Sequence, residues 1–149
     1  MKEAVVSDST CLIGLERIGK LDILPALFAL IMIPPEVERE FGGKFPWLKV
    51  ENLKDNLLVK ALQMVVDAGE AEAIALASEK NYPLISDDKQ ARAAAKRLGV
   101  EFIGTVGVLA RAKQNGVIAA LKPILDDLES NNFFISRALR EEALKIVGE

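Results

Sequence analysis

Acidic residues stand in this sequence where buried strands would end or helices would begin. Asp8 follows the apolar segment 4–7 (AVVS), and Asp87 and Asp88 follow the segment 82–86 (YPLIS). If these strands are parallel, their carboxyl ends meet at one edge of a sheet, where such side chains converge. Further candidates come from the helical patterns at 35–41 and 70–80: Glu36, Glu38, Glu40, Glu70 and Glu72.

Each of these acids has an ordinary structural explanation when it is taken alone. Asp is a common N-cap, and Glu in a first helical turn complements the helix dipole. Several carboxylates packed together, however, raise one another's pKa and lower stability. A hard divalent cation removes this conflict, because Mg²⁺ and Mn²⁺ prefer oxygen ligands. Such an ion can activate a water and stabilise charge on a phosphoryl oxygen, and the pattern therefore indicates a metal ion among these acids.

Helical spacing favours some of these acids over their neighbours. At about 100° per residue, Glu70 shares an apolar face with Ala73, Ile74 and Ala77, whereas Glu72 lies on a mixed face. In the segment 35–41, Glu40 lies closer to the inward-facing pair of Val37 and Phe41 than Glu36 or Glu38 does. Glu70 and Glu40 are therefore the favoured candidates, whereas the choice between Asp87 and Asp88 stays open.

Composition excludes several other kinds of active site. The 149 residues contain no histidine and a single cysteine, Cys11. A histidine general base, a Ser-His-Asp triad and a zinc site built from His or several Cys are therefore excluded. The net charge of -3 argues against a basic nucleic-acid binder, although local patches matter more than the total charge.

The elements that must position these acids alternate along the chain. Strands are expected at 4–7, 29–33, 47–53, 82–86, 100–105 and 131–136, and helical patterns at 10–28, 35–41, 56–66, 70–80, 89–99, 106–116, 118–130 and 137–147. This alternation predicts one α/β domain over 1–149, with a mostly parallel sheet between helices. We expect Trp47, Phe133 and Phe134 to pack against other side chains rather than to stack on bases. No apolar run has membrane-spanning length and the first ten residues lack a signal-peptide pattern, so a cytoplasmic location is expected.

The order of four motifs resembles the PIN-domain family, the ribonuclease fold of VapC-type toxins. These motifs are VVSDST, IPPEVEREF, DAGEAEAIALA and PLISDDKQAR. The segment 102–136 is similar to a branch of uncharacterised prokaryotic PIN proteins with a GT-G-L--AK--G-I pattern. The resemblance spans nearly the whole chain.

The resemblance implies a three-layer α/β/α sandwich and a Mg²⁺- or Mn²⁺-dependent ribonuclease, often dimeric or of higher order. It maps the family's catalytic and metal-binding acids onto Asp8, Glu40, Glu70 and Asp88, with Asp87 as a further possible ligand, and it makes Ser9 a candidate for binding the metal shell or a phosphate. As a toxin, the protein would act on RNA and pair with a small antitoxin.

Basic residues after the acidic pair are candidates for contact with the substrate. Lys89, Arg92 and Lys96 share one helical face, which would either contact phosphates or remain a solvated surface. Two other functions stay open: a PIN-fold binding module without catalysis, and a receiver-like phosphoacceptor domain. The receiver-like reading expects the acidic pair after the first strand, whereas here the pair follows a later one.

Overall fold

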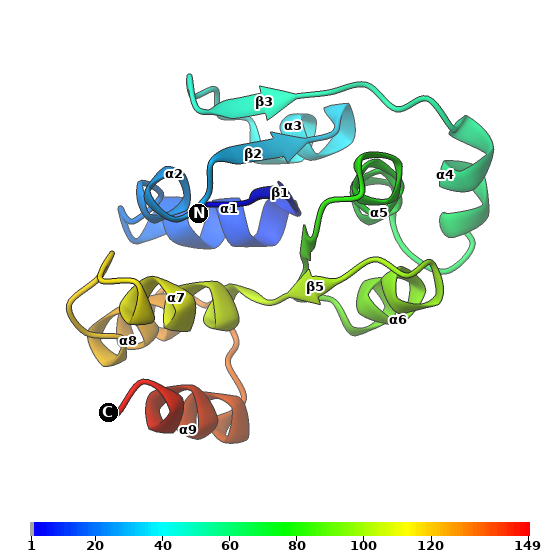
Figure 1. Cartoon of the computed structure of the whole chain (residues 1–149). Coiled ribbons are helices and arrows are strands. Elements are labelled where there is room, and N and C mark those ends of the chain that lie inside the picture. Colours follow the sequence, from blue (N-terminus) through cyan, green and yellow to red (C-terminus); the bar gives the residue numbers. More distant parts are fainter. Residues whose placement is uncertain (1) are drawn as a thin grey trace.

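The central sheet has five parallel strands in the order β3-β2-β1-β4-β5 (Figure 1). The computed structural model describes residues 2–149. The strands are β1 (Ala4–Ser7), β2 (Leu30–Ile33), β3 (Leu48–Val50), β4 (Leu84–Ile85) and β5 (Phe102–Ile103). The strand order reverses between β1 and β4, and parallel sheets bind ligands beyond the strand ends at such a point.

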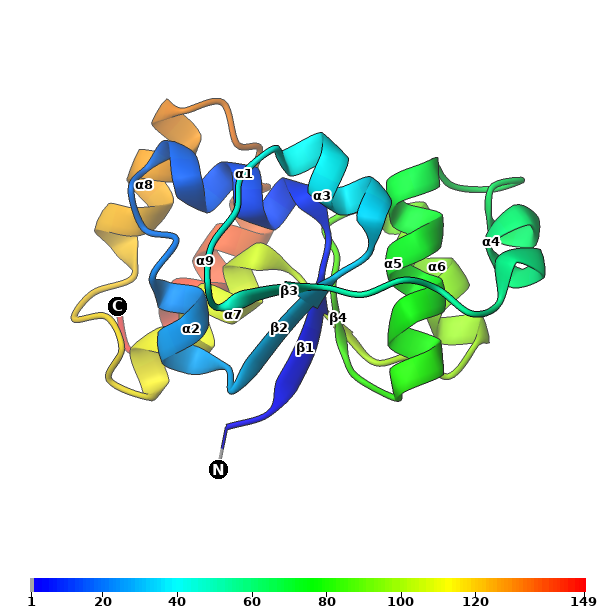
Figure 2. The ribbon, with the colours of Figure 1, turned by 90° about the horizontal axis from the view of Figure 1, so that it is seen from above.

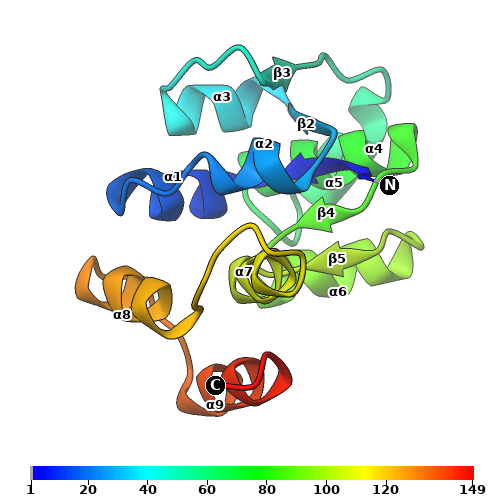
Figure 3. The same ribbon diagram turned by 60° about the vertical axis from the view of Figure 1, so that its left-hand side comes forward.

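Helices cover both faces of the sheet, which confirms the three-layer α/β/α sandwich. On one side lie α4 (Asn56–Leu62), α5 (Ala68–Lys80) and α6 (Lys89–Arg97); on the other lie α1 (Ser9–Arg17), α2 (Ile23–Leu27), α7 (Thr105–Gln114) and α8 (Lys122–Ser130) (Figure 2). The short α3 (Pro35–Phe41) lies beyond the carboxyl end of β2 and contacts both α1 and α5. The last helix, α9 (Arg137–Ile146), packs on α7 away from the sheet (Figure 3).

Small residues bring α5 close to the sheet. Its alanines at 71, 73, 75 and 77 are buried together with Ile74 and Leu76, and α5 contacts β1. The three central strands β1, β2 and β4 are buried on both faces, as in other parallel sheets, so Val5, Val6 and Ile33 have no exposed surface. The core therefore holds the carboxyl ends of β1 and β4 and the start of α5 in a defined arrangement.

Three segments differ from the sequence prediction. The helix expected at 56–66 ends at Leu62. Residues 131–136 form a turn and an irregular segment rather than a strand, and the helix expected at 118–130 begins only at Lys122. The segment 131–136 alternates as a strand would, with Ile135 buried and Phe134 exposed. It packs among helices, however, and pairs with no strand of the sheet, so it forms no ladder.

No helix in residues 2–149 is both long enough and apolar enough to cross a membrane.

Candidate active site

Asp8 is held in one orientation at the carboxyl end of β1. It caps α1 through Oδ1, which accepts a hydrogen bond from Cys11 N at 3.0 Å, while Oδ2 accepts one from Asp87 N at 3.2 Å. The residue is only 6% exposed. Burial, with the nearby charge of Asp87, raises the pKa of Asp8 from 3.8 to about 7 despite these two hydrogen bonds.

Asp87 joins the end of β4 to the start of α7. Its carboxylate accepts hydrogen bonds from Thr105 N at 2.9 Å and from Thr105 Oγ1 at 2.5 Å. A guanidinium nitrogen of Arg92 lies 4.0 Å from the same carboxylate. Because its own backbone N–H also donates to Asp8, Asp87 links the ends of β1 and β4 to α7.

Asp88 and Glu70 face the same acidic region from two different helices. Asp88 caps α6 through a 2.8 Å hydrogen bond from Ala91 N. Partial burial and the charges of Asp67, Asp88 and Glu40 raise the pKa of Glu70 from 4.5 to about 7. Glu70 also contributes to the raised pKa of Asp8, so charges from β1, α5 and the β4–α6 turn act on one another.

Glu40 reaches this cluster from the last turn of α3 and lies against the start of α5. A methyl group at Gly69 would collide with the Glu40 carboxylate, so the glycine makes the space for that side chain. Burial and the charge of Asp67 raise the pKa of Glu40, whereas a hydrogen bond from the Ser9 side chain lowers it. The four acids predicted from sequence, and Ser9, therefore lie in one region, which we call the acidic cluster: Asp8, Glu40, Glu70 and Asp88.

Asp67 is an acid of this region that the sequence reasoning missed. It caps α5 by accepting a 2.9 Å hydrogen bond from Glu70 N, and its charge raises the pKa of both Glu40 and Glu70. The signal was present, since an N-cap residue followed three positions later by Glu marks a helix start.

Glu72 and Glu36, which helical spacing made less favoured candidates than Glu70 and Glu40, have other partners. The Glu72 carboxylate accepts a 3.1 Å hydrogen bond from Glu36 N in the first turn of α3. Glu36 itself pairs with Arg39 on the exposed side of that helix. The hydrogen bond to Glu72 connects α3 to α5, against whose Gly69 the Glu40 carboxylate lies.

The basic residues predicted to contact substrate differ in their surroundings. Lys89 is exposed at the start of α6. Arg92 is half-buried: its Nε donates to Ser86 O at 2.7 Å, and its guanidinium lies 5.4 Å from the centre of the Phe102 ring. Gly104 leaves the space that the guanidinium occupies. Arg92 therefore holds the turn after β4, and Lys89 is the more accessible of the two cations.

The carboxylate oxygens of the acidic cluster are chemically suited to a divalent cation, but they do not surround a single point. Within residues 2–149, no group of three or more His, Cys, Asp or Glu is arranged to hold a metal ion. All four members of the acidic cluster offer carboxylate oxygens, the ligands that Mg²⁺ and Mn²⁺ prefer. The buried Ser86 Oγ, at the end of β4, has no hydrogen-bond partner among these residues. The residues fit the ion in type and charge, and their carboxylates would have to draw together to bind it.

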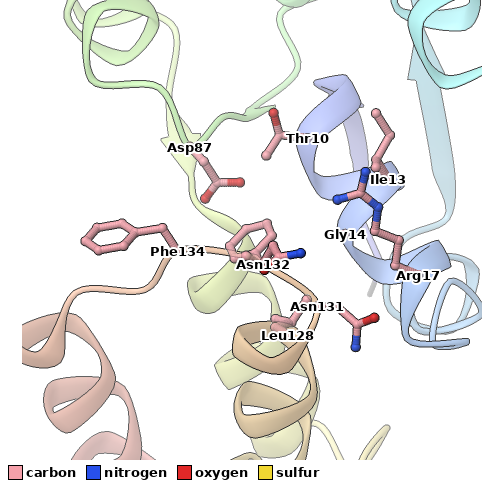
Figure 4. Close-up of a pocket in the computed structure, with 10 residues that line it drawn as sticks. Thr10, Ile13, Gly14, Arg17, Asp87, Leu128, Asn131, Asn132 and Phe134 are labelled. Carbon is pink, nitrogen blue, oxygen red and sulfur yellow. The ribbon is translucent and has the colours of Figure 1, made fainter.

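A cavity of about 470 Å³ lies beside Asp87, between α1 and the segment 131–134 (Figure 4). Its lining combines polar and apolar side chains from α1, α8 and that segment: Thr10, Ile13, Gly14, Arg17, Asp87, Leu128, Asn131, Asn132, Phe133 and Phe134. Phe134 is 87% exposed, so the expectation that it packs against other side chains is wrong. Trp47 does pack as expected, with its ring centre 5.3 Å from that of Phe45.

The protein is a parallel α/β sandwich with acidic side chains beyond the ends of β1 and β4, where the strand order reverses. Proteins with this combination form a class that includes nucleases. A family model described as DUF3368, PIN domain, matches residues 4–149. The chain therefore belongs to the PIN-domain family, whose members are generally nucleases, and this confirms the resemblance seen in the motifs.

One solved structure and the curated proteins complete the comparison. The structure is a PilT N-terminus domain protein, SSO1118, from the hyperthermophilic archaeon Sulfolobus solfataricus P2. It is 22% identical, with a TM-score of 0.50 over 72% of this chain and 91% of its own, and this likeness supports the fold alone. No curated protein gives a significant match.

Proposed function

We propose that this protein is a divalent-metal-dependent ribonuclease that hydrolyses phosphodiester bonds in RNA. The observation that supports it most is the raised pKa of Asp8 and of Glu70, each about 7, in a cluster drawn from separate segments of the chain. Such a grouping lowers the stability of the protein alone, and a bound cation would reverse that effect. Membership of a family of nucleases supports the same class of reaction.

Asp8, Glu40, Glu70 and Asp88 would hold Mg²⁺ or Mn²⁺. When bound, such an ion lowers the pKa of a coordinated water and stabilises charge on phosphate oxygens. Asp8 presents its carboxylate in an orientation set by two backbone N–H groups. Glu40 is on the exposed side of α3 and Glu70 is half-buried, so their longer side chains can adjust. Asp87 remains the second choice to Asp88, because its carboxylate faces the Arg92 guanidinium at 4.0 Å in addition to the two hydrogen bonds from Thr105.

The substrate would approach from the side of Ser9 and Lys89. Ser9 lies beside Glu40, and the exposed Lys89 follows Asp88 directly. A cation next to the acidic cluster can hold a phosphate of the RNA backbone that the cluster alone would repel. Arg92 would act on the substrate mainly by holding the turn that carries Asp88.

Cleavage of a labelled single-stranded RNA in Mn²⁺ or Mg²⁺ tests this proposal. The wild type should cut the RNA, and Asp8→Asn and Asp88→Asn should each abolish cleavage. The matched control is Asp22→Asn, an exposed aspartate whose side chain makes no capping hydrogen bond. Cleavage that persists in excess chelator or in Asp8→Asn would overturn the proposal, and a wild type that binds RNA without cutting it would favour the binding module.

We extend the proposal to a toxin that is inhibited by a small antitoxin and acts as a homodimer. The PIN family includes toxins of this kind, and large apolar side chains are exposed on and after α4, with Leu57 at 78% and Met64 at 86%. An adjacent small open reading frame whose product blocks RNA cleavage would support the toxin role. A gene without such a neighbour would contradict that role and leave the nuclease proposal intact. Sedimentation of the wild type and of Met64→Asp tests the dimer, which the charge should disrupt.

A further inference from the structure

The cavity between α1 and the segment 131–134 adjoins the acidic cluster. Asp87 lines one end of it, and the backbone N–H of the same residue donates to Asp8. Figure 4 shows Asp87 and Thr10 near one another, with Arg17 on α1 and Asn132 on the facing segment. A chain of nucleotides with one phosphate at the acidic cluster would therefore pass beside this cavity.

The groups around the cavity match the parts of a nucleotide. Phe134 presents an exposed aromatic ring, on which a base can stack. The amide of Asn132 and the hydroxyl of Thr10 offer donors and acceptors for the edge of a base. Arg17 is exposed and forms no ion pair with any residue between 2 and 149, so its charge is available to a phosphate.

The segment that carries Phe134 is held in place before any ligand arrives. The Phe133 ring packs on α1 at Gly14, where an added methyl group would lie 2.8 Å from the ring. Asn131 donates from Nδ2 to Asp127 O at 2.9 Å, which ties the segment to α8. Asn132 adopts a left-handed conformation with φ of 67°, and the chain then turns Phe134 outwards. Because the segment 131–134 is already ordered, binding of a ligand to it costs less conformational entropy.

We propose that this cavity is a binding subsite for one unpaired nucleotide of the RNA that the acidic cluster cleaves. The inference rests on the proposed function and adds the place where the substrate binds: an unstacked base of the RNA would leave the strand and stack on Phe134. The volume of about 470 Å³ is in the usual range for a small-ligand site. A protein partner is the less favoured occupant, because amides and an unpaired arginine next to a phosphate-processing site suit a nucleotide better than an apolar side chain.

Binding of an RNA oligonucleotide that contains 2-aminopurine tests the subsite separately from catalysis. The measurement uses the full chain with Asp8→Asn, so that the RNA stays intact, and follows fluorescence quenching and the dissociation constant. Phe134→Ala should weaken binding on the order of tenfold and reduce the quenching, because a base loses its stacking partner. Phe134→Tyr should restore both, and Arg17→Gln should weaken binding and reduce its salt dependence.

The control is Ile146→Ala, which shortens an exposed apolar side chain at the end of α9, outside the lining of the cavity. It should bind RNA as the parent does. If Phe134→Ala binds and quenches as the parent does, the subsite is overturned and a protein partner becomes the occupant to test, while cleavage by the wild type would still support the nuclease. If the wild type does not cleave RNA but Phe134→Ala still weakens binding, the ribonuclease proposal fails and the nucleotide subsite stands.

Discussion

Replacement of Asp8 by Asn should make the metal-free protein more stable at pH 8 than the wild type. In the unfolded chain this carboxyl has its ordinary pKa of 3.8, whereas in the fold burial and Asp87 raise it to about 7. The folded state therefore holds the proton more tightly. As the pH rises from about 4 to about 7, the unfolded chain loses its proton first, so the free energy of unfolding falls.

The two pKa values give the size of the effect. A rise from 3.8 to about 7 corresponds to a destabilisation of about 4 kcal/mol once the pH exceeds 7. About 3 kcal/mol of this develops between pH 5 and pH 8. Asn cannot ionise, so the variant lacks this dependence. It loses one of the two backbone hydrogen bonds that Asp8 accepts, at a pH-independent cost of about 1 kcal/mol. The two proteins should be similar in stability near pH 5 and diverge by pH 8.

Urea unfolding followed by the fluorescence of Trp47 measures this difference, in chelator at pH 5 and pH 8. Addition of Mn²⁺ at pH 8 should then stabilise the wild type and leave Asp8→Asn nearly unchanged, since a ligand stabilises the state that binds it. Asp22→Asn should follow the wild type throughout. Parallel pH dependences for the wild type and Asp8→Asn would refute the reasoning, because they would mean that Asp8 ionises in the fold without a penalty.

Three substitutions near the acidic cluster separate catalysis from stability. Gly69→Ala should lower RNA cleavage by about tenfold or more, because the added methyl group displaces the Glu40 carboxylate. The same substitution should change the free energy of unfolding by less than about 1 kcal/mol. Unchanged cleavage would argue against a role for Glu40. Glu72→Ala should have the opposite effects in the same two assays. It removes the carboxylate that accepts the hydrogen bond from Glu36 N, so the free energy of unfolding should fall by about 1 kcal/mol, while most of the cleavage is retained. Ser86→Ala should raise the free energy of unfolding of the metal-free protein by about 1 kcal/mol, because the buried hydroxyl has no partner within residues 2–149. A lower free energy of unfolding would reveal a hydrogen bond made through water.

The fold could be predicted from sequence largely because parallel strands are short, apolar and separated by strong helix signals. The segment 35–41 is a helix with the bounds expected, whereas the helical pattern at 10–28 is divided near Gly19, whose φ is 68°. The segment 131–136 was misread because alternation of buried and exposed residues does not distinguish a strand from an irregular segment packed among helices. Only pairing with another strand makes that distinction, and pairing is a tertiary property.

The members of the acidic cluster could be predicted from the sequence, but the contacts that distinguish each acid from its neighbours could not. Helix-face geometry favours Glu70 over Glu72, and the structure gives the reason: Glu72 turns towards the backbone of α3. The sequence could not separate Asp87 from Asp88, because what distinguishes them is Thr105, which lies 18 positions from Asp87 along the chain. Assignment of metal ligands among these acids stays a prediction.

Asp87 and Asp88, the two consecutive aspartates after β4, make separate hydrogen bonds, so one can be replaced without removing the contacts of the other's side chain. Asp87 fastens the strand end to α7, the helix that leads on to α8 and the segment carrying Phe134, while Asp88 only caps its own helix. If Asp88 binds the metal ion, as proposed, its replacement should alter reactivity and leave the architecture intact. Variation at Asp87 would shift the relation between the acidic edge and the C-terminal third of the chain, so the two neighbours should tolerate very different replacements.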